Sequence, residues 1–101
     1  MAKYFLVVRS VVPAAHRGAF DDWYRTDQMP KSLGPLGALD GHRYWSDSEP
    51  PVHYAFYEFS DIETPRAIKR RFDGPDGLLM NEFSATWPDI SRTREVIVLA
   101  D

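Results

Sequence analysis

The chain has 101 residues, of which 44% are hydrophobic and 27% charged, the size and proportions of one globular domain. Disorder of the whole chain and a second independent domain are therefore excluded, and we expect one domain over residues 1–101. The formal net charge is −3, and the one dense basic cluster, residues 69–71, is better explained as a solvated helix face than as a phosphate site. We therefore expect no nucleic-acid partner.

The residue types limit the chemistry further. The chain has no cysteine, which excludes disulfides and thiolate catalysis, and its three histidines show no spacing typical of a metal site. The longest aliphatic run, residues 5–8, is far too short to span a bilayer, and the N-terminus has no apolar signal region. We therefore expect a cytoplasmic protein with no metal and no membrane partner.

The first third of the chain predicts a strand followed by a helix. Residues 3–12 (KYFLVVRSVV) are rich in β-branched and aromatic side chains and end at a proline, which indicates a strand. Residues 13–27 place apolar side chains, among them Phe20, Trp23 and Tyr24, at helical intervals. Pro30 and the glycines and prolines of residues 32–41 (SLGPLGALDG) predict that the helix stops and a loop follows.

The middle of the chain predicts a β-hairpin. Residues 42–46 (HRYWS) and 52–59 (VHYAFYEF) are typical of strands, and the intervening DSEPP is typical of a turn. Thr64, as an N-cap before Pro65, then predicts a short helix that ends around residues 73–75.

The C-terminal quarter predicts a second helical piece and a last strand. After Asp76, the side chains of Leu79, Phe83 and Trp87 recur every four residues on one helix face, and a proline follows. Residues 94–100 (REVIVLA) predict the final strand.

The order strand-helix-strand-strand-helix-strand predicts an α+β, ferredoxin-like fold (βαββαβ), a four-stranded antiparallel sheet with its helices on one face. The strands look apolar on both faces, so the uncovered face needs a partner, and a second copy of the chain is the simplest one. We therefore expect a homodimer, a dimeric α/β barrel.

Alternation along the strands divides their side chains between the two faces. The face expected toward the helices contains Leu6, Val8, His42, Tyr44, His53, Ala55, Tyr57, Phe59, Val96 and Val98. The opposite face contains Phe5, Val7, Arg9, Arg43, Trp45, Tyr54, Phe56, Glu58, Ile97 and Leu99. This parity sets Tyr44 opposite His53, and a slip of one residue would exchange the faces of a strand.

Three segments resemble a known family: residues 21–30 (DDWYRTDQMP), 41–45 (GHRYW) and 53–61 (HYAFYEFSD). They are similar to the dimeric α/β-barrel superfamily, and within it to the EthD-like proteins. The resemblance implies a homodimer with a cavity between sheet and helices in each subunit. The superfamily includes cofactor-free monooxygenases, muconolactone-type isomerases, polyketide cyclase-like proteins and haem enzymes, so the fold does not select a reaction. EthD-like proteins commonly have a histidine where this chain has Gln28, and glutamine can donate hydrogen bonds but cannot transfer protons near neutral pH.

The first candidate site is a pocket beneath the first helix. We expect Trp23, Tyr24, Gln28 and Met29 to line it and to stack on an aromatic or hydrophobic small molecule. His42, from the sheet, and Phe83 and Trp87, from the second helical piece, complete the predicted substrate-binding set. The alternative is that the aromatic residues are core and that Gln28 is an ordinary loop residue.

The second candidate is a group of catalytic side chains: His53, Tyr57 and Tyr44. A histidine and a tyrosine paired across the hairpin could serve as general acid and base on an enolisable or phenolic substrate. The alternative is that these are core polar residues with satisfied hydrogen bonds. We expect no cofactor; haem would need an axial histidine, for which either His42 or His53 could serve and neither is marked out.

Three classes of function remain open. The first is a small cofactor-independent enzyme, an isomerase, cyclase or oxygenase, that acts on an aromatic or polyketide-like molecule. The second is a non-catalytic protein that binds a hydrophobic metabolite for a degradation pathway. The third is a structural homodimer domain. The aromatic, histidine and tyrosine lining favours the first class, and Gln28 favours the second.

Overall fold

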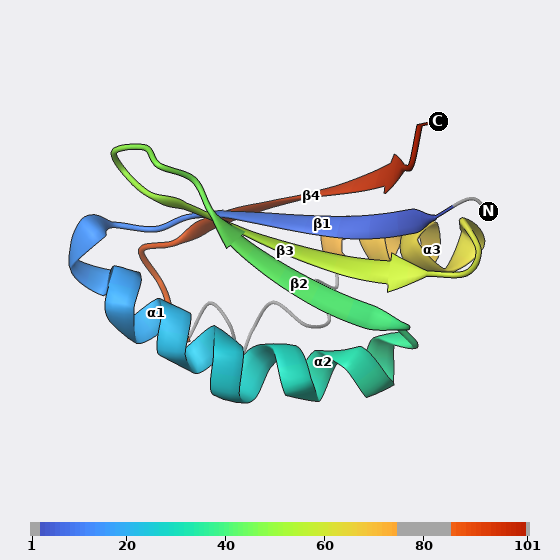
Figure 1. Cartoon of the computed structure of the whole chain (residues 1–101), viewed down its shortest axis with the longest axis horizontal. Helices are drawn as coiled ribbons and strands as arrows, with labels where there is room; N and C mark the ends of the chain where they lie inside the picture. Colours follow the sequence, from blue (N-terminus) through green and yellow to red (C-terminus); the bar gives the residue numbers. More distant parts are fainter. Residues whose placement is uncertain (1–2, 75–85, 101) are drawn as a thin grey trace.

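The computed structural model describes residues 3–74 and 86–100, in which four antiparallel strands form one sheet. The strands are β1 (Tyr4–Val11), β2 (Asp40–Trp45), β3 (Val52–Phe59) and β4 (Ser91–Val98), and they lie in the order β2-β3-β1-β4. The helices are α1 (Arg17–Trp23), α2 (Met29–Leu36) and α3 (Glu63–Asp73). Figure 1 shows α1 and α2 running beneath the sheet as one long helical segment. The predicted ferredoxin-like α+β fold is confirmed.

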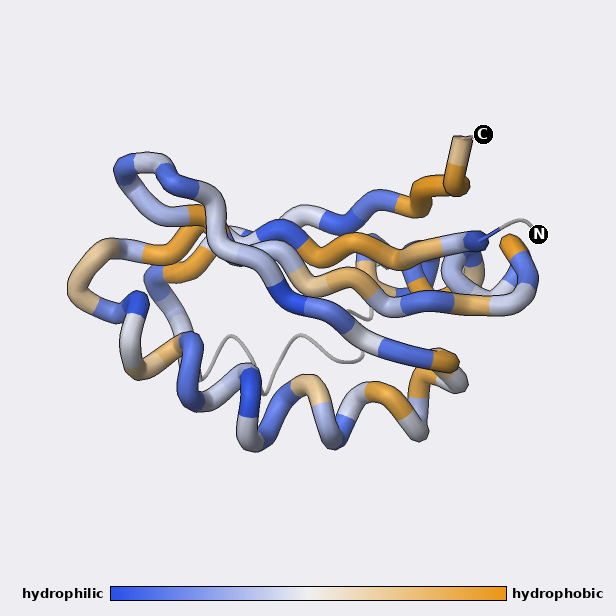
Figure 2. Tube along the Cα trace, in the orientation of Figure 1, coloured by the Kyte–Doolittle hydropathy of each residue, from blue (hydrophilic) through white to orange (hydrophobic). Residues whose placement is uncertain are grey.

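The core lies between the sheet and the helices. Leu6 and Val8 of β1 and Ala55 and Phe59 of β3 are buried in one hydrophobic cluster that also includes Phe20 of α1. Figure 2 shows hydrophobic residues along the central strand β1, whereas the edge strand β2 is mostly hydrophilic. The alternation of apolar side chains on β1 and β3 therefore directs one face of each central strand into the core. No helix in the described ranges is long and apolar enough to cross a membrane.

The helical segment continues beyond the point where the sequence predicts a loop. A 3₁₀ turn (Ala14–His16) precedes α1, and a π-helical turn (Tyr24–Gln28) joins α1 to α2. Pro30 lies just after the π turn and Pro35 lies inside α2, so each removes a backbone N–H from the continuous helical segment. Burial of Met29 and packing of Leu33 on the core offset the cost of the prolines. The predicted loop over residues 32–41 is therefore too long: residues 32–36 are helical, residues 40–41 belong to β2, and only residues 37–39 connect the two elements.

Gly37 ends this helical segment. Its φ is +74°, the left-handed conformation that glycine adopts without steric cost, and its N–H donates to the carbonyls of Leu33 and Gly34. The chain then enters β2 at Asp40. The helix stop is therefore set by the glycine and not by either proline.

The pairing of β2 corrects the predicted faces. The register is Gly41 with Tyr57, Arg43 with Ala55, and Trp45 with His53. His42 pairs with Phe56 and Tyr44 with Tyr54, so His42 and Tyr44 belong to the outer face. The predicted faces are correct for β1, β3 and β4 and wrong for β2, and the predicted Tyr44–His53 pair does not form.

Two other boundaries differ from the predictions. β4 begins at Ser91, before the predicted residue 94, and this brings Arg92 into the sheet opposite Ser10. Helix α3 begins at Glu63, and Asp61 caps it by accepting hydrogen bonds from the backbone N–H of Thr64 (2.7 Å) and from its hydroxyl (3.1 Å). The predicted second helical piece, including Leu79 and Phe83, falls largely outside the described residues.

Candidate functional site

A cavity of about 200 Å³ lies between the sheet and the α1–α2 segment. Its apolar wall consists of Leu6, Val8, Trp23, Pro35, Leu36 and Phe72. Its polar groups come from Tyr24, Gln28, Lys31, Ser32, Tyr57 and Arg92. The cavity is thus an apolar space into which a few hydrogen-bonding groups converge, as in sites that bind small molecules.

The helical segment supplies its lining at regular intervals. Tyr24, Gln28, Ser32 and Leu36 are four residues apart and so lie along one face of the segment. Ser32 Oγ donates a 2.6 Å hydrogen bond to the carbonyl of Gln28, the last residue of the π turn. This bond gives the Gln28 carbonyl a partner. Because the helix continues through Pro30, this face extends along the whole cavity.

Two buried tyrosines meet in this cavity. The hydroxyl oxygens of Tyr24 and Tyr57 are 3.2 Å apart, and both side chains are almost fully buried. Burial raises the pKa of Tyr24 well above its usual value, and the neighbouring Tyr57 adds to this effect. Burial also raises the pKa of Tyr57, although hydrogen bonds with Tyr24 and Ser32 act in the opposite direction. Both hydroxyls therefore stay protonated at neutral pH, and because one proton lies in the bond between them, the other remains to be donated.

Arg92 lies on the same side of the sheet. It is half-buried, and its guanidinium lies 5.7 Å from the ring centre of Phe72. Burial lowers its pKa to about 10, as does the charge of Arg94, while Tyr24 and Tyr57 act in the opposite direction. Arg92 therefore remains a cation at neutral pH, at the edge of an apolar cavity.

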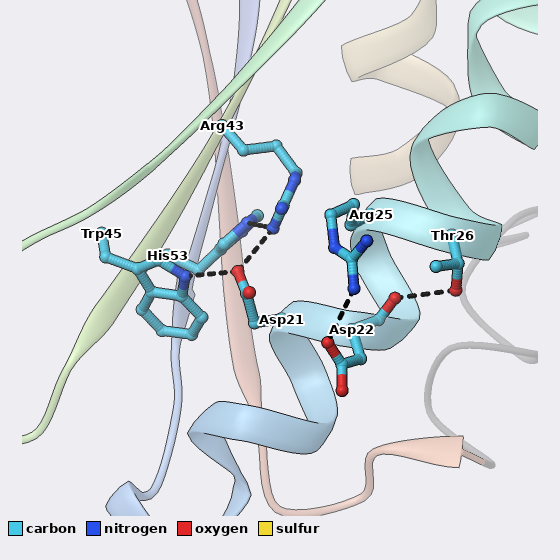
Figure 3. Close-up of polar contacts among 7 residues, drawn as sticks. All are labelled: Asp21, Asp22, Arg25, Thr26, Arg43, Trp45 and His53. Atoms are coloured by element: carbon cyan, nitrogen blue, oxygen red, sulfur yellow. Dashed lines mark hydrogen bonds and ion pairs between the residues drawn. The ribbon is translucent and has the colours of Figure 1, made fainter.

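His53 lies outside the cavity, in a cluster that links β2 to α1 (Figure 3). Asp21 Oδ1 accepts hydrogen bonds from Trp45 Nε1 (2.7 Å) and from Arg43 Nη1 (2.9 Å), and Arg43 Nη1 lies 3.2 Å from His53 Nε2. Since arginine can only donate, Nε2 of His53 is the acceptor and its proton resides on Nδ1.

The environment of His53 keeps it neutral. Its imidazole is fully buried, with its ring centre 4.5 Å from that of Tyr24 and about as close to Phe20 (5.1 Å) and Trp45 (5.0 Å). Burial lowers its pKa to about 4, the charge of Arg43 adds to this effect, and Asp21 partly opposes it. His53 supports the ring of Tyr24, but it cannot reach a molecule in the cavity.

Only some of the residues predicted to form the site line the cavity. Trp23, Tyr24, Gln28 and Tyr57 line the cavity. Met29 is buried in the core. Its Sδ lies against Gly41, where a Cβ atom would come within 2.9 Å of it.

The remaining predicted site residues lie elsewhere. His42 and Tyr44 are exposed on the outer face, where His42 Nε2 lies 3.2 Å from Asp40. Trp87 packs on Phe20 (5.4 Å between ring centres) and on Trp23 (5.8 Å), behind the lining. Phe83 is outside the described residues. The register of β2 differs from the predicted one by one residue, and this difference places His42 and Tyr44 on the outer face and not toward the helices.

Several residues that line the cavity are not among those that the sequence predicts for the site. Ser32, Pro35 and Leu36 fall in the segment predicted as a loop, although their spacing from Tyr24 and Gln28 already continues a helical stripe. Arg92 precedes the predicted last strand, and nothing in its sequence context indicates that it faces the helices. Phe72, the last apolar residue of the predicted helix, was assigned no role in the site.

The histidines also bear on the cofactor prediction. Neither imidazole that was considered for haem, His42 or His53, faces the cavity beneath the helices. In the described part of the chain, no three His, Cys, Asp or Glu side chains are grouped as they would be to hold a metal ion. The cavity is thus furnished with hydroxyl, amide and cationic groups, which bind and polarise oxygen atoms.

The fold resembles solved structures of dimeric ferredoxin-like proteins. One, from an uncultured marine organism, is 16% identical, with a TM-score of 0.61 over 99% of this chain and 96% of that one. A second, also from an uncultured marine organism, is 7% identical, with a TM-score of 0.58 over 98% of this chain and 93% of that one. No protein-family model and no curated protein matches the chain. At these identities the likeness concerns the fold alone, and the chain has the ferredoxin-like fold of these dimeric proteins.

Proposed function

We propose that the protein binds a small, largely apolar molecule in the cavity between the sheet and the α1–α2 segment. The observation that carries this proposal is the pair of buried hydroxyls, Tyr24 and Tyr57, directed into a cavity with apolar walls. The two hydroxyls share one hydrogen bond, which uses one of their two protons. The second proton can be donated to a carbonyl or hydroxyl oxygen of a bound molecule.

The resemblance to EthD-like proteins supports the same position for the site. Gln28, which stands where those proteins commonly have a histidine, lines the cavity. An amide there can orient a bound oxygen atom but cannot exchange a proton with it. This residue favours a binding protein over a proton-transfer enzyme.

Cofactor-independent catalysis, of the isomerase, cyclase or oxygenase type, is the second candidate, and the tyrosine pair favours it. Neutral hydroxyls that donate to a carbonyl oxygen stabilise the negative charge that develops when the substrate enolises. His53 is not the base, because its ring lies behind Tyr24. The described lining contains no imidazole and no carboxylate, so solvent would have to remove the proton.

We also propose that the protein is a homodimer whose outer sheet faces meet. Phe56 on this face packs on Phe5 (6.0 Å between ring centres) and on Tyr44 (5.4 Å), and Tyr44 is 55% exposed. Ile97 and Leu99 extend the same hollow. An apolar sheet face of this kind calls for a cover, and the solved neighbours with this fold are dimeric.

Binding is tested by NMR titration with phenol, a one-ring molecule with a hydroxyl group. We expect the indole N–H resonance of Trp23, in the cavity wall, to shift, while that of Trp45, bonded to Asp21, stays in place. Ser32→Leu, which fills the cavity, should abolish the shifts, and Ser32→Ala should retain them. Unchanged Trp23 and Ser32 signals at millimolar phenol would refute the binding proposal.

Catalysis is tested separately with an enolisable ketone. We expect the protein to accelerate hydrogen–deuterium exchange at the methylene of phenylpyruvate beyond the rate in buffer, and Tyr57→Phe to remove the acceleration because one oxyanion donor is lost. Tyr54→Phe, on the opposite sheet face, is the matched control. If phenylpyruvate exchanges only at the rate seen in buffer while phenol still binds, the catalytic candidate is refuted and the binding proposal stands.

A further inference from the structure

The described lining of the cavity contains cations but no carboxylate, and one of these cations is paired outside the lining, since Lys31 Nζ lies 3.2 Å from Asp27 Oδ1. Among its described lining residues are two cations, Lys31 and Arg92, and no carboxylate. The remaining polar groups are an amide that can donate, two tyrosine hydroxyls that share one hydrogen bond and so have one proton left to donate, and a serine hydroxyl whose proton is donated to the Gln28 carbonyl. In an apolar space this combination attracts a negatively charged group and rejects a positively charged one.

A second arginine, Arg94, lies two residues from Arg92 on the same face of β4. Arg94 lies 3.6 Å from Asp73 and 4.2 Å from the ring centre of Phe72. The carboxylate of Asp73 therefore pairs with Arg94, while the ring of Phe72, which lies against both arginines, lines the cavity. Arg92, in the wall itself, lies on the same side of the sheet as Tyr24 and Tyr57, whose pKa values it lowers by its charge.

The size of the cavity limits the body of the ligand. An apolar cavity of about 150 Å³ accommodates benzene, whereas sites for drug-sized ligands measure about 300–1,000 Å³. At about 200 Å³ the cavity fits one ring with a short substituent. Trp23 and Phe72 supply aromatic surface for such a ring, and the polyketide-like ligands considered from the sequence are too large for it.

We propose that the ligand is a one-ring aromatic acid, whose ring lies against the wall of Trp23 and Leu36 and whose carboxylate is bound by Arg92 together with the hydroxyls of Tyr24 and Tyr57. This proposal rests on the proposed small-molecule function and specifies its ligand class. Arginine presents N–H groups that match a carboxylate, and the tyrosine pair adds a neutral donor that cannot repel it.

The test compares benzoate with benzamide, which has the same ring and nearly the same shape but no charge. Dissociation constants are measured by NMR titration of the wild-type protein at neutral pH and low salt, with the Trp23 indole and the Ser32 amide as reporters. We expect benzoate to bind at least about tenfold more tightly than benzamide, the range of a charge-assisted hydrogen bond. The preference should diminish as salt is added.

Arg92→Met should remove the preference while benzamide still binds. Arg17→Met, which removes an exposed arginine that stacks on Trp45 at 4.8 Å outside the cavity, is the matched control and should leave the preference intact. Should Arg92→Met not fold, the wild-type comparison decides alone, and Arg92→Lys should retain part of the preference because it keeps the charge.

The outcomes separate this proposal from the function on which it rests. Equal binding of benzoate and benzamide at the Trp23 and Ser32 reporters would overturn the acid proposal and leave small-molecule binding standing. A preference for benzoate that persists in Arg92→Met would likewise overturn it. If neither compound, nor phenol, perturbs these reporters, the proposed small-molecule function itself has failed.

Discussion

The indole N–H of Trp45 donates a 2.7 Å hydrogen bond to Asp21, and this contact fixes the edge strand β2 to the helix α1. Asp21 also accepts from Arg43, whose side chain reaches His53 on the neighbouring strand. The next residue, Asp22, points outward and pairs with Arg25 at 2.9 Å (Figure 3). Two adjacent aspartates therefore have different roles, and only one of them connects the sheet to the helix.

Asp21→Asn should destabilise the protein. The substitution keeps the shape but removes the charge that receives two donors, and since the carboxylate is 37% exposed we expect a loss of only about 1 kcal/mol in the free energy of unfolding. Urea unfolding at neutral pH measures it. Asp22→Asn, on the 73%-exposed neighbour, is the matched control and should change the free energy by less than about 0.5 kcal/mol.

The difference between wild type and Asp21→Asn should depend on pH in a defined direction. The hydrogen bond from Trp45 lowers the pKa of Asp21 below 3.8, against the effect of burial, and Arg43 lowers it further. The carboxylate thus contributes its full stability above the ordinary pKa of 3.8 and loses it as the pH falls through the lowered folded value. We expect the difference between the two proteins to narrow only below pH 3.8 and to vanish below the folded pKa; a difference already lost above pH 3.8 would contradict the assignment.

His53 should make the fold sensitive to mild acid. Its pKa falls from 6.5 in the unfolded chain to about 4 in the folded protein, so between these values the unfolded state binds a proton that the folded state excludes. Stability is then full above about pH 6.5 and declines toward about pH 4, by an amount on the order of 3 kcal/mol. Chemical unfolding across this pH range measures the decline.

His53→Gln should flatten this dependence, because glutamine can still accept from Arg43 but does not titrate. His42→Gln, on the exposed outer face, should leave it in place. A wild-type protein whose stability is constant between about pH 7 and about pH 4.5 would show that His53 is protonated in the fold.

Two glycines three residues apart should respond in opposite ways to alanine. Gly37 has a φ of +74°, so Gly37→Ala should cost about 1 kcal/mol or more, because a Cβ is strained in the left-handed region. Gly34 lies inside α2, and a Cβ atom there would meet nothing within 4 Å. Gly34→Ala should therefore stabilise the protein by about 0.5–1 kcal/mol. Thermal unfolding of both variants checks the pair.

Phe56→Glu should dissociate the proposed dimer. A charge at the centre of the outer sheet face would be buried without a partner when two such faces meet. Size-exclusion chromatography with light scattering should show a dimer for wild type and a monomer for the variant. Leu39→Glu, which alters a 64%-exposed leucine outside this face, should remain a dimer. A monomeric wild type would refute the dimer proposal.

The topology, the central strands and the position of the tyrosines could be predicted from the sequence, because they depend on local periodicity. Alternation along residues 4–11 and 52–59 gives both strands and their inner faces, and the helical spacing of Phe20, Trp23 and Tyr24 gives the buried stripe of α1. The run DDWYRTDQMP mixes aromatic and charged residues because the helix exposes Asp22 and Arg25 while it buries Tyr24.

The rest of the site was decided by tertiary structure. Whether Pro30 stops a helix depends on what the following turns bury, and here Met29 and Leu33 hold α2 together on the sheet. The register of β2 depends on the link from Trp45 to Asp21, which joins residues far apart in the chain, and it places Tyr44 on the outer face and Arg43 on the helix side, beside Asp21 and His53. Arg92 reaches the cavity only because β4 begins early and pairs with β1. These choices rest on free energies of packing between distant segments, which local patterns do not contain.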